Sequence, residues 1–300
     1  MTRERITFWA ALAALVLGAA AAYLLLLGRE PAAPAPAPPS PAVPLAVATV
    51  EGEVTVIRAG VRSRVLPGAP LRPDDALETA PGGRVEVVGG GYTVALEEGG
   101  QFTVGEITAQ LSRFRLGAGL VSARVQDDPA RSVEIEGSPD AVARTRGGEV
   151  SVSRAGTTVA VGVRRGRADF TAGGATVALA EGQQSESRAG ARPSPAAPLP
   201  ASLLLKVTWP AARTTNERRM VVTGRATPGS IVVLGGERVE VQADGRFTHV
   251  IVLREGRQTL AAHALGVAGK ASSEGPTIVL DTRAPDARFD TRDLWVKPRP

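Results

Sequence analysis

The feature that most constrains this chain is one apolar run, residues 7–28, which reads TFWAALAALVLGAAAAYLLLLG and contains no charged side chain. As a helix it would be about 33 Å long, enough to cross a bilayer core of about 30 Å. A cleaved signal peptide is the alternative, because Ala20 and Ala22 offer an A-x-A site. Since four leucines follow that site and such apolar regions are usually shorter, we expect an uncleaved transmembrane anchor.

The charges beside this run predict its orientation. Three positive charges precede the run, those of Arg3, Arg5 and the free amino terminus, whereas only Arg29 follows it closely. The positive-inside rule then places residues 1–6 in the cytoplasm and residues 29–300 outside it. We therefore expect a single-pass protein of the bacterial inner membrane whose working part is periplasmic.

Two proline-rich stretches divide the exported part. Seven of the 14 residues in 31–44 are proline, which favours a polyproline II spacer of roughly 40 Å. A second stretch rich in proline, alanine and serine follows the first predicted domain. The predicted order is a cytoplasmic stub 1–6, a transmembrane helix 7–28, a linker 29–44, a first domain 45–187, a linker 188–202, a second domain 203–285 and a tail 286–300.

Strand signals dominate both domains. Short runs rich in valine, isoleucine and threonine alternate with polar residues and end at glycine, proline or aspartate. We find no segment after residue 28 with a helical period and both caps. The fold class predicted is therefore all-β, with strands expected at 53–58, 84–88, 92–96, 132–135, 149–153 and 176–179.

One internal repeat lies within the first domain. The sequence GEVTVIRAG at 52–60 returns as GEVSVSRAG at 148–156, with seven of nine positions identical. This predicts an identical strand-plus-turn unit used twice.

Few residues are suited to catalysis or to metal binding. The chain has no cysteine and only two histidines, His249 and His263, in strand-like segments without metal-ligand spacing. Asp74-Asp75 and Asp127-Asp128 suggest calcium, but neither pair belongs to a D-x-D-x-D-G loop. For Asp74-Asp75 turn capping is preferred, because the family that the first domain resembles, named below, has a turn aspartate at this place. We predict no enzyme, no catalytic residues, no cofactor and no metal site; the binding residues stay unknown.

The net charge of +5 does not indicate a nucleic-acid partner. The arginines are spread along both domains, and the densest group, Arg164, Arg165 and Arg167, is interpreted as a solvated turn. A nucleic-acid site would need a concentrated basic face. Trp209 and Phe247 are predicted to be core residues and not stacking platforms for sugars.

Residues 48–187 resemble the exported domain of the FecR family. The resemblance lies in the order and spacing of several short motifs, and Arg146-Gly147-Gly148 departs from the usual R-G-T step. The motifs are Gly52-Glu53-Val54, Gly68–Leu71, Asp75–Thr79, Val85–Val87 with the glycines 89–91, Tyr92–Leu96, an expected hairpin at Leu116–Val121, and Val177–Gln183. The resemblance implies a sensor module that relays receptor occupancy to a cytoplasmic sigma factor. Because residues 1–6 are too short to contact such a factor, we do not expect that output.

Residues 205–282 look like a bacterial Ig-like module of the glucodextranase-like kind, with about seven strands in a β-sandwich. Turns are expected at Thr227-Pro228-Gly229, at Gly235-Gly236 and at Asp244-Gly245, the last as a type I′ hairpin turn. The tail 286–300, which contains Trp295, is expected to be partly ordered.

Together these features predict a membrane-anchored, non-enzymatic binding or scaffold protein of the cell envelope. The expected partner is an envelope protein, peptidoglycan or another glycan, and no nucleic acid. Two alternatives stay open, a FecR-type transmembrane signalling regulator and an accessory carbohydrate-binding subunit, in which Trp209 or Trp295 would contact sugar.

Overall fold

The computed structural model describes residues 44–211 and 213–283, and within them the chain forms strands and no helix. The all-β prediction is confirmed for this part, and no helix within it is long and apolar enough to cross a bilayer. The predicted anchor 7–28, the stub 1–6, the linker up to residue 43 and the tail 286–300 lie outside the described residues.

The strands of the first β domain are β1 (Leu45–Glu51), β2 (Val54–Arg58), β3 (Val61–Arg64), β4 (Pro70–Leu71), β5 (Ala76–Thr79), β6 (Arg84–Gly89), β7 (Tyr92–Leu96), β8 (Gln101–Ile107), β9 (Leu111–Val125), β10 (Ser132–Ser138), β11 (Ala141–Thr145), β12 (Gly148–Ala155), β13 (Thr158–Ala172), β14 (Ala175–Ala180), β15 (Gln183–Arg188) and β16 (Ala197–Pro198). All six predicted strands fall on observed ones, and most are longer than predicted. Residues of the predicted linker 188–202 pair with the domain, because β16 lies beside β15.

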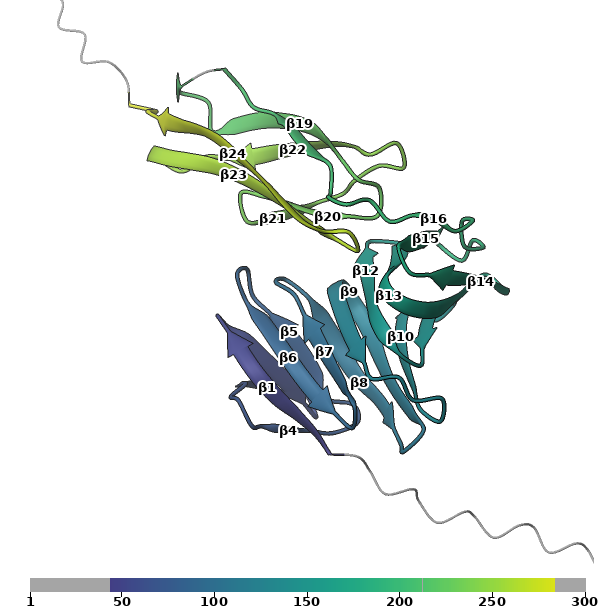
Figure 1. Ribbon diagram of the computed structural model, residues 1–300. Coiled ribbons are helices and arrows are strands. Elements are labelled where there is room, and N and C mark those ends of the chain that lie inside the picture. The colour runs from purple at the N-terminus through teal and green to yellow at the C-terminus, as the bar shows by residue number, and fades with distance from the viewer. Residues whose placement is uncertain (1–43, 212, 284–300) are drawn as a thin grey trace, which may run out of the picture. The chain divides into compact units, whose positions relative to one another are not determined.

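These strands form one 16-stranded sheet with two branches, which we call ladders, and both branches contain β9 and β13 (Figure 1). One ladder has the order β4-β1-β6-β7-β9-β12-β13-β15-β16. The other has the order β3-β2-β5-β8-β9-β10-β11-β13-β14, in which β9 and β10 run parallel. One hydrophobic core holds residues of both ladders, as expected for a sheet that folds back on itself.

The two long strands pass from one ladder to the other at glycines. In β9 the change falls at Gly119, which has a φ of 105°, and in β13 at Gly166, with a φ of 81°. Two predictions were wrong for this reason. Leu116–Val121 is not a hairpin but the bend inside β9, and Arg164–Arg167 is not a turn but the exposed bend inside β13. In both cases the glycines permit a bend that does not end the strand.

The core of the first domain is built from alternate strand residues. Three aromatic rings lie at its centre: Phe114 contacts Phe102 with ring centroids 5.6 Å apart and Tyr92 at 5.9 Å, both edge to face. Such pairs add to the free energy gained by burying the rings.

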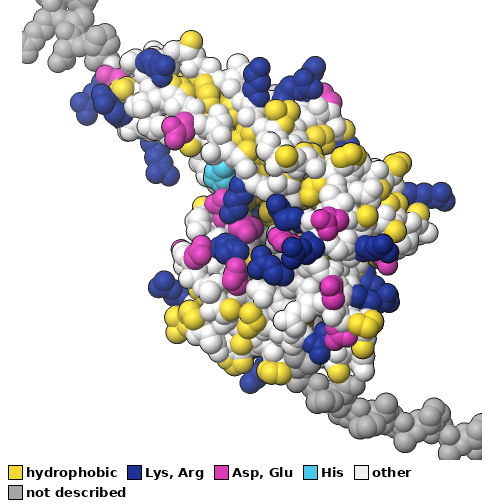
Figure 2. All heavy atoms as spheres, viewed as in Figure 1, with side chains coloured by type: hydrophobic (Ala, Val, Ile, Leu, Met, Phe, Trp, Pro, Cys, Tyr) yellow, Lys and Arg dark blue, Asp and Glu magenta, His cyan; other side chains and the backbone are white. Residues whose placement is uncertain are grey.

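The surface of this domain carries arginines interleaved with acidic side chains. Figure 2 shows them as mixed dark blue and magenta on the visible face.

The repeated sequence forms a strand followed by a hairpin in both places, but the turn is displaced by one residue. In the first copy Arg58 pairs with Val61, so the turn residues are Ala59 and Gly60. In the second copy Ala155 pairs with Thr158, so the turn begins one position later in the repeat. The units are therefore similar and not identical. Their hairpin partners also differ. The partner of β2 is the edge strand β3, whereas the partner of β12 is β13, which pairs with further strands.

The second β domain contains β17 (Leu205–Thr208), β18 (Thr214–Thr215), β19 (Arg219–Ala226), β20 (Ile231–Leu234), β21 (Glu237–Val239), β22 (Arg246–Val252), β23 (Gly256–Gly266) and β24 (Gly269–Leu280). They form a three-stranded sheet, β17-β19-β22, and a five-stranded sheet, β18-β24-β23-β20-β21. Phe247, Leu234 and Ile278 are fully buried in a core shared by both sheets. This is a two-sheet sandwich, as predicted.

The turns of this domain follow their glycines. Gly235 and Gly236 both have positive φ, and they form the predicted two-residue turn between β20 and β21. The type I′ prediction for Asp244-Gly245 was wrong. Only Gly245 has a positive φ, and Gly245 N–H donates to the Gln242 carbonyl at 2.9 Å. Because β21 and β22 belong to different sheets, no two-residue hairpin joins them.

Candidate functional site

The β2–β3 hairpin presents an open strand edge. Its two-residue turn has φ values of 50° at Ala59 and 80° at Gly60, and both are positive, as a type I′ turn requires. Within the described residues β3 pairs with β2 alone, so its other edge has no strand beside it. The hairpin therefore ends one of the two ladders.

The register of the hairpin determines which backbone groups face this edge. In a two-residue hairpin the flanking pair, Arg58 and Val61, exchanges hydrogen bonds, and every second pair does so after it. The Val65 N–H donates to the Val54 carbonyl at 3.0 Å, which fits this alternation. The N–H and C=O groups of Arg62 and Arg64 consequently point away from β2, towards the open edge.

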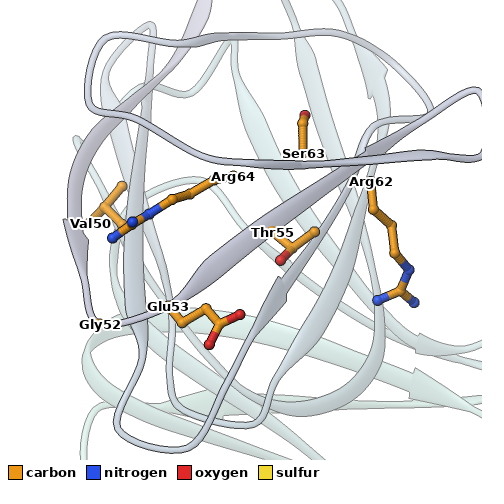
Figure 3. Close-up of a pocket in the computed structure, with 7 residues that line it drawn as sticks. All are labelled: Val50, Gly52, Glu53, Thr55, Arg62, Ser63 and Arg64. Carbon is orange, nitrogen blue, oxygen red and sulfur yellow. The ribbon is translucent and has the colours of Figure 1, made fainter.

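An opening of about 710 Å³ lies beside this hairpin, lined by residues from β1, β2, β3 and the connection between β1 and β2. Figure 3 shows its lining: Arg64 extends to the side on which Val50 lies, and Arg62 points the other way. Glu53 and Thr55 lie at the β2 side of the opening. β1 pairs with β4 only through Leu45 and Ala46, so the later part of β1 is not covered by β4.

Charged and apolar side chains surround the edge. Arg62 pairs with Glu78 on β5 at 2.9 Å. For Arg64 the described residues place no carboxylate within 4.0 Å. Val61 is 67% exposed and Leu66 is 65% exposed, although both are apolar. The edge thus combines free backbone groups, one unpaired cation and two exposed apolar side chains.

An ion pair holds the turn end of the hairpin. Arg58, at the end of β2, donates from Nε to Oδ1 of Asp75 at 2.8 Å and from an Nη to Oδ2 at 2.6 Å. Asp75 also accepts the Arg72 N–H at 2.8 Å. Burial by itself raises the pKa of Asp75, but the hydrogen bonds and charge of Arg58 and the Arg72 N–H outweigh it, so the pKa lies below its usual value. The predicted turn-capping role of Asp75 is observed, while its partner Arg58 was not predicted.

The other candidate residues of the sequence are not brought together. His249 lies on β22 and pairs with Glu237 at 3.2 Å, and His263 lies on β23, opposite Ser272. β22 and β23 belong to different sheets, so the histidines are not cross-strand neighbours. Asp128 caps a turn by accepting the Ala130 N–H at 2.9 Å. The described part of the chain holds no group of three or more histidine and acidic side chains placed to bind a metal.

The two predicted core aromatics differ in burial. Phe247 is fully buried, as expected. Trp209 is half-buried against the core, and its Nε1 donates to the Ser273 hydroxyl at 3.2 Å. The one hydrogen-bond donor of its ring is therefore already bonded within the domain. Trp295 lies outside the described residues.

A comparison with protein families finds a match in the second domain. Residues 204–282 match the family of glucodextranase domain B. The match agrees with the resemblance expected for this region and with its two-sheet sandwich. It covers about a quarter of the chain, so it describes this domain and not the whole protein. No well-characterised protein matches the sequence significantly.

Solved structures with some similarity include two of a putative anti-sigma factor from Parabacteroides distasonis. They are 17% and 18% identical to this chain, each with a TM-score of 0.35, covering 39% of this chain and 56% of theirs. A polysaccharide lyase is 13% identical, with a TM-score of 0.20, covering 78% of this chain and 40% of its own. The chain thus spans little more than half the length of the first of these proteins. TM-scores below 0.5 do not establish a shared fold, so the function proposed below depends on the geometry of this chain.

Proposed function

We propose that this chain is a non-enzymatic binding protein of the cell envelope, and that its first domain captures an extended, acidic segment of an envelope protein along β3. The observation that carries the proposal is the open edge of β3, with the backbone groups of Arg62 and Arg64 directed outward. An added strand would satisfy these groups by β-augmentation. The FecR-like motifs of this domain and the predicted periplasmic position agree with an exported binding module.

The side chains at the edge define the chemistry of the partner. In an antiparallel pair, side chains directly opposite each other interact, and opposite charges are favourable there. Arg64 lacks a carboxylate partner in the described region, so an acidic side chain of the added strand would pair with it. Val61 and Leu66 offer apolar surface to the neighbouring positions. The fitting segment therefore alternates acidic and apolar residues.

Titration with synthetic peptides tests this function. The probes are a heptapeptide of alternating glutamate and valine and its glutamine-valine analogue, added to the full-length ¹⁵N-labelled chain in a mild non-ionic detergent. We expect the glutamate peptide to slow hydrogen exchange at the amides of Arg62 and Arg64, because these N–H groups would donate to the added strand. The Ser63 amide, which faces β2, should change much less.

Two variants separate the backbone from the side chain. Arg64→Pro removes the outward N–H together with the charge, whereas Arg64→Ala removes only the charge. We expect Arg64→Ala to weaken binding of the glutamate peptide about threefold and Arg64→Pro to weaken it further. If neither peptide protects these amides, β3 does not take up such a strand. Its arginines would then only keep the edge from pairing with other chains, which is a common use of edge charges.

A further inference from the structure

The outer face of the three-stranded sheet in the second domain carries cationic, hydroxyl and apolar side chains together. Strands β17, β19 and β22 contribute ten side chains to it, all of them exposed. They are Lys206 and Thr208 on β17, Arg219, Val221, Thr223 and Arg225 on β19, and Arg246, Thr248, Val250 and Val252 on β22. We call these ten residues the outer face.

The register arranges the outer face in rows across the strands. Lys206 lies opposite Arg225, and Arg225 lies opposite Arg246, so three cations stand side by side. Neighbouring strands are about 4.8 Å apart, so the row is about 10 Å wide. Like charges directly opposite each other destabilise a sheet. This row therefore lowers the stability of the sheet unless anions neutralise it.

Within the described residues, little neutralises the row. Arg246 pairs with Asp244 at 3.3 Å. The described residues place no carboxylate within 4.0 Å of Lys206 or Arg225. Protection of a sheet edge does not explain Arg225, because β19 is the central strand of the three. The row is thus a cationic feature without an evident structural purpose.

A row of hydroxyl groups lies beside the cations. Thr208 is opposite Thr223, and Thr223 is opposite Thr248, two residues along each strand from the cations. The described structure gives none of these three hydroxyls a hydrogen-bond partner. Two residues along a strand cover about 6.7 Å, so hydroxyls and cations can contact one ligand together. Beyond the threonines, Val221 and Val250 offer apolar surface, with exposed fractions of 60% and 44%.

We infer that the outer face binds an anionic polysaccharide, a sugar chain that bears carboxylates. The cations would pair with its carboxylates, the threonine hydroxyls with its hydroxyls, and the valines with its C–H surface. A lipid bilayer fits less well, because the valines and the cations project from the same face of one sheet. The valines could not enter the acyl region while the neighbouring cations stay among the headgroups. Single-stranded nucleic acid fits less well because the face has no aromatic side chain for base stacking.

Three polymers test the inference with the full-length chain in a mild non-ionic detergent, titrated by calorimetry at 50 mM NaCl. Polygalacturonate carries both carboxylates and hydroxyls, dextran is a neutral glucan, and poly-L-glutamate is a polyanion without sugar hydroxyls. We expect polygalacturonate to bind most tightly and dextran not to bind measurably. Added salt should weaken the binding, because the charges are exposed.

Variants of the outer face then locate the binding. The triple variant K206Q/R225Q/R246Q should bind polygalacturonate about tenfold or more weakly. Its matched control, R254Q/R257Q/R283Q, removes the same charge from exposed positions elsewhere in this domain and should bind within about twofold of the unaltered chain. The pair T223V/T248V should weaken polygalacturonate binding several-fold and leave poly-L-glutamate binding unchanged.

The outcomes separate the inference from its alternatives. Equal losses in both triple variants would mean that net charge, and not this face, holds the polymer. Equal binding of poly-L-glutamate and polygalacturonate, with no effect of T223V/T248V, would overturn the assignment to a glycan. Because the outer face lies in the other domain from β3, failure of this inference leaves the proposed function untouched, and the reverse also holds.

Discussion

Arg113 on β9 donates from Nε to Oε2 of Glu134 on β10 at 2.9 Å, across the parallel pair of strands in the first domain. From the other side, Arg144 on β11 donates its Nε to Oε1 of the same carboxylate at 2.6 Å. Glu134 is only 4% exposed, so its charge is stable there because two guanidinium groups and their hydrogen bonds replace water.

Replacing this carboxylate should destabilise the first domain. Glu134→Gln keeps the shape but leaves two arginines without their counter-ion, and we expect a loss of about 2 kcal/mol in the free energy of unfolding. Urea denaturation at pH 7 measures it. Glu136→Gln, on the same strand but more exposed, is the control and should change the free energy by less than about 0.5 kcal/mol. Equal losses in the two variants would contradict the prediction.

The stability of the first domain should fall in acid. Burial raises the pKa of Glu134, but Arg144 and Arg113 outweigh it, so the pKa lies below the usual 4.5, as that of Asp75 lies below 3.8. A carboxylate with a lowered pKa binds fewer protons in the folded state than in the unfolded state. Its contribution is therefore complete well above pH 4.5 and is lost as the pH falls through the folded-state pKa.

The corresponding measurement is the urea midpoint at pH 7, 5, 4 and 3. For the unaltered chain the midpoint should be nearly constant between pH 7 and 5 and should fall below that. In the variant D75N/E134Q the midpoint should start lower and fall less steeply. If the urea midpoint fell equally steeply with pH in both chains, other carboxylates would be responsible for the loss of stability in acid.

Gly119 should tolerate a methyl group less well than Gly60. Both have a positive φ, so alanine is strained at either position. A Cβ at Gly119 would also lie 2.5 Å from the Cα of Gly100, whereas a Cβ at Gly60 meets nothing within 4 Å. We expect Gly60→Ala to cost about 1 kcal/mol and Gly119→Ala at least about 2 kcal/mol. Thermal unfolding of both variants tests the difference, and equal costs would argue against a close approach at the bend of β9.

Proline should distinguish the two edges of β3. Ser63→Pro removes an N–H that faces β2 and should cost at least about 1 kcal/mol of stability. Arg64→Pro removes an N–H that faces outward and should cost clearly less, because proline is tolerated on an open strand edge. Urea denaturation of the two variants measures this order. The reverse order would show that the hydrogen-bonded pairs of the hairpin are assigned to the wrong residues.

The sequence indicated much of the fold because strand periodicity and glycine turns are local signals. The run YTVAL predicts a strand at 92–96, and β7 has these bounds. Gly235-Gly236 predicts a tight turn, and both residues have positive φ. Asp244-Gly245 and Leu116–Val121 were misinterpreted, because whether a glycine ends a strand or bends it depends on which strands lie beside it.

The candidate site could not be predicted in the same way. Nothing local shows that the segment VRSR at 61–64 has a neighbour on one side only, although Ala59-Gly60 before it and its alternating arginines could have suggested an edge hairpin. The outer face was equally hidden. Lys206, Arg225 and Arg246 are far apart in the chain, and only the register of three strands sets them side by side.

The sequence by itself determined the predominance of strands, the lack of cysteine chemistry and tight turns such as Gly235-Gly236, because each follows from residue types and their immediate spacing. The tertiary structure decided which strands are edges, where the long strands change ladders, and which charges meet. Glu134 is an example: its sequence neighbours do not reveal that two arginines, 21 residues before and 10 residues after it, neutralise its charge. Such contacts depend on pairing between distant segments, which the free energy of the whole sheet selects.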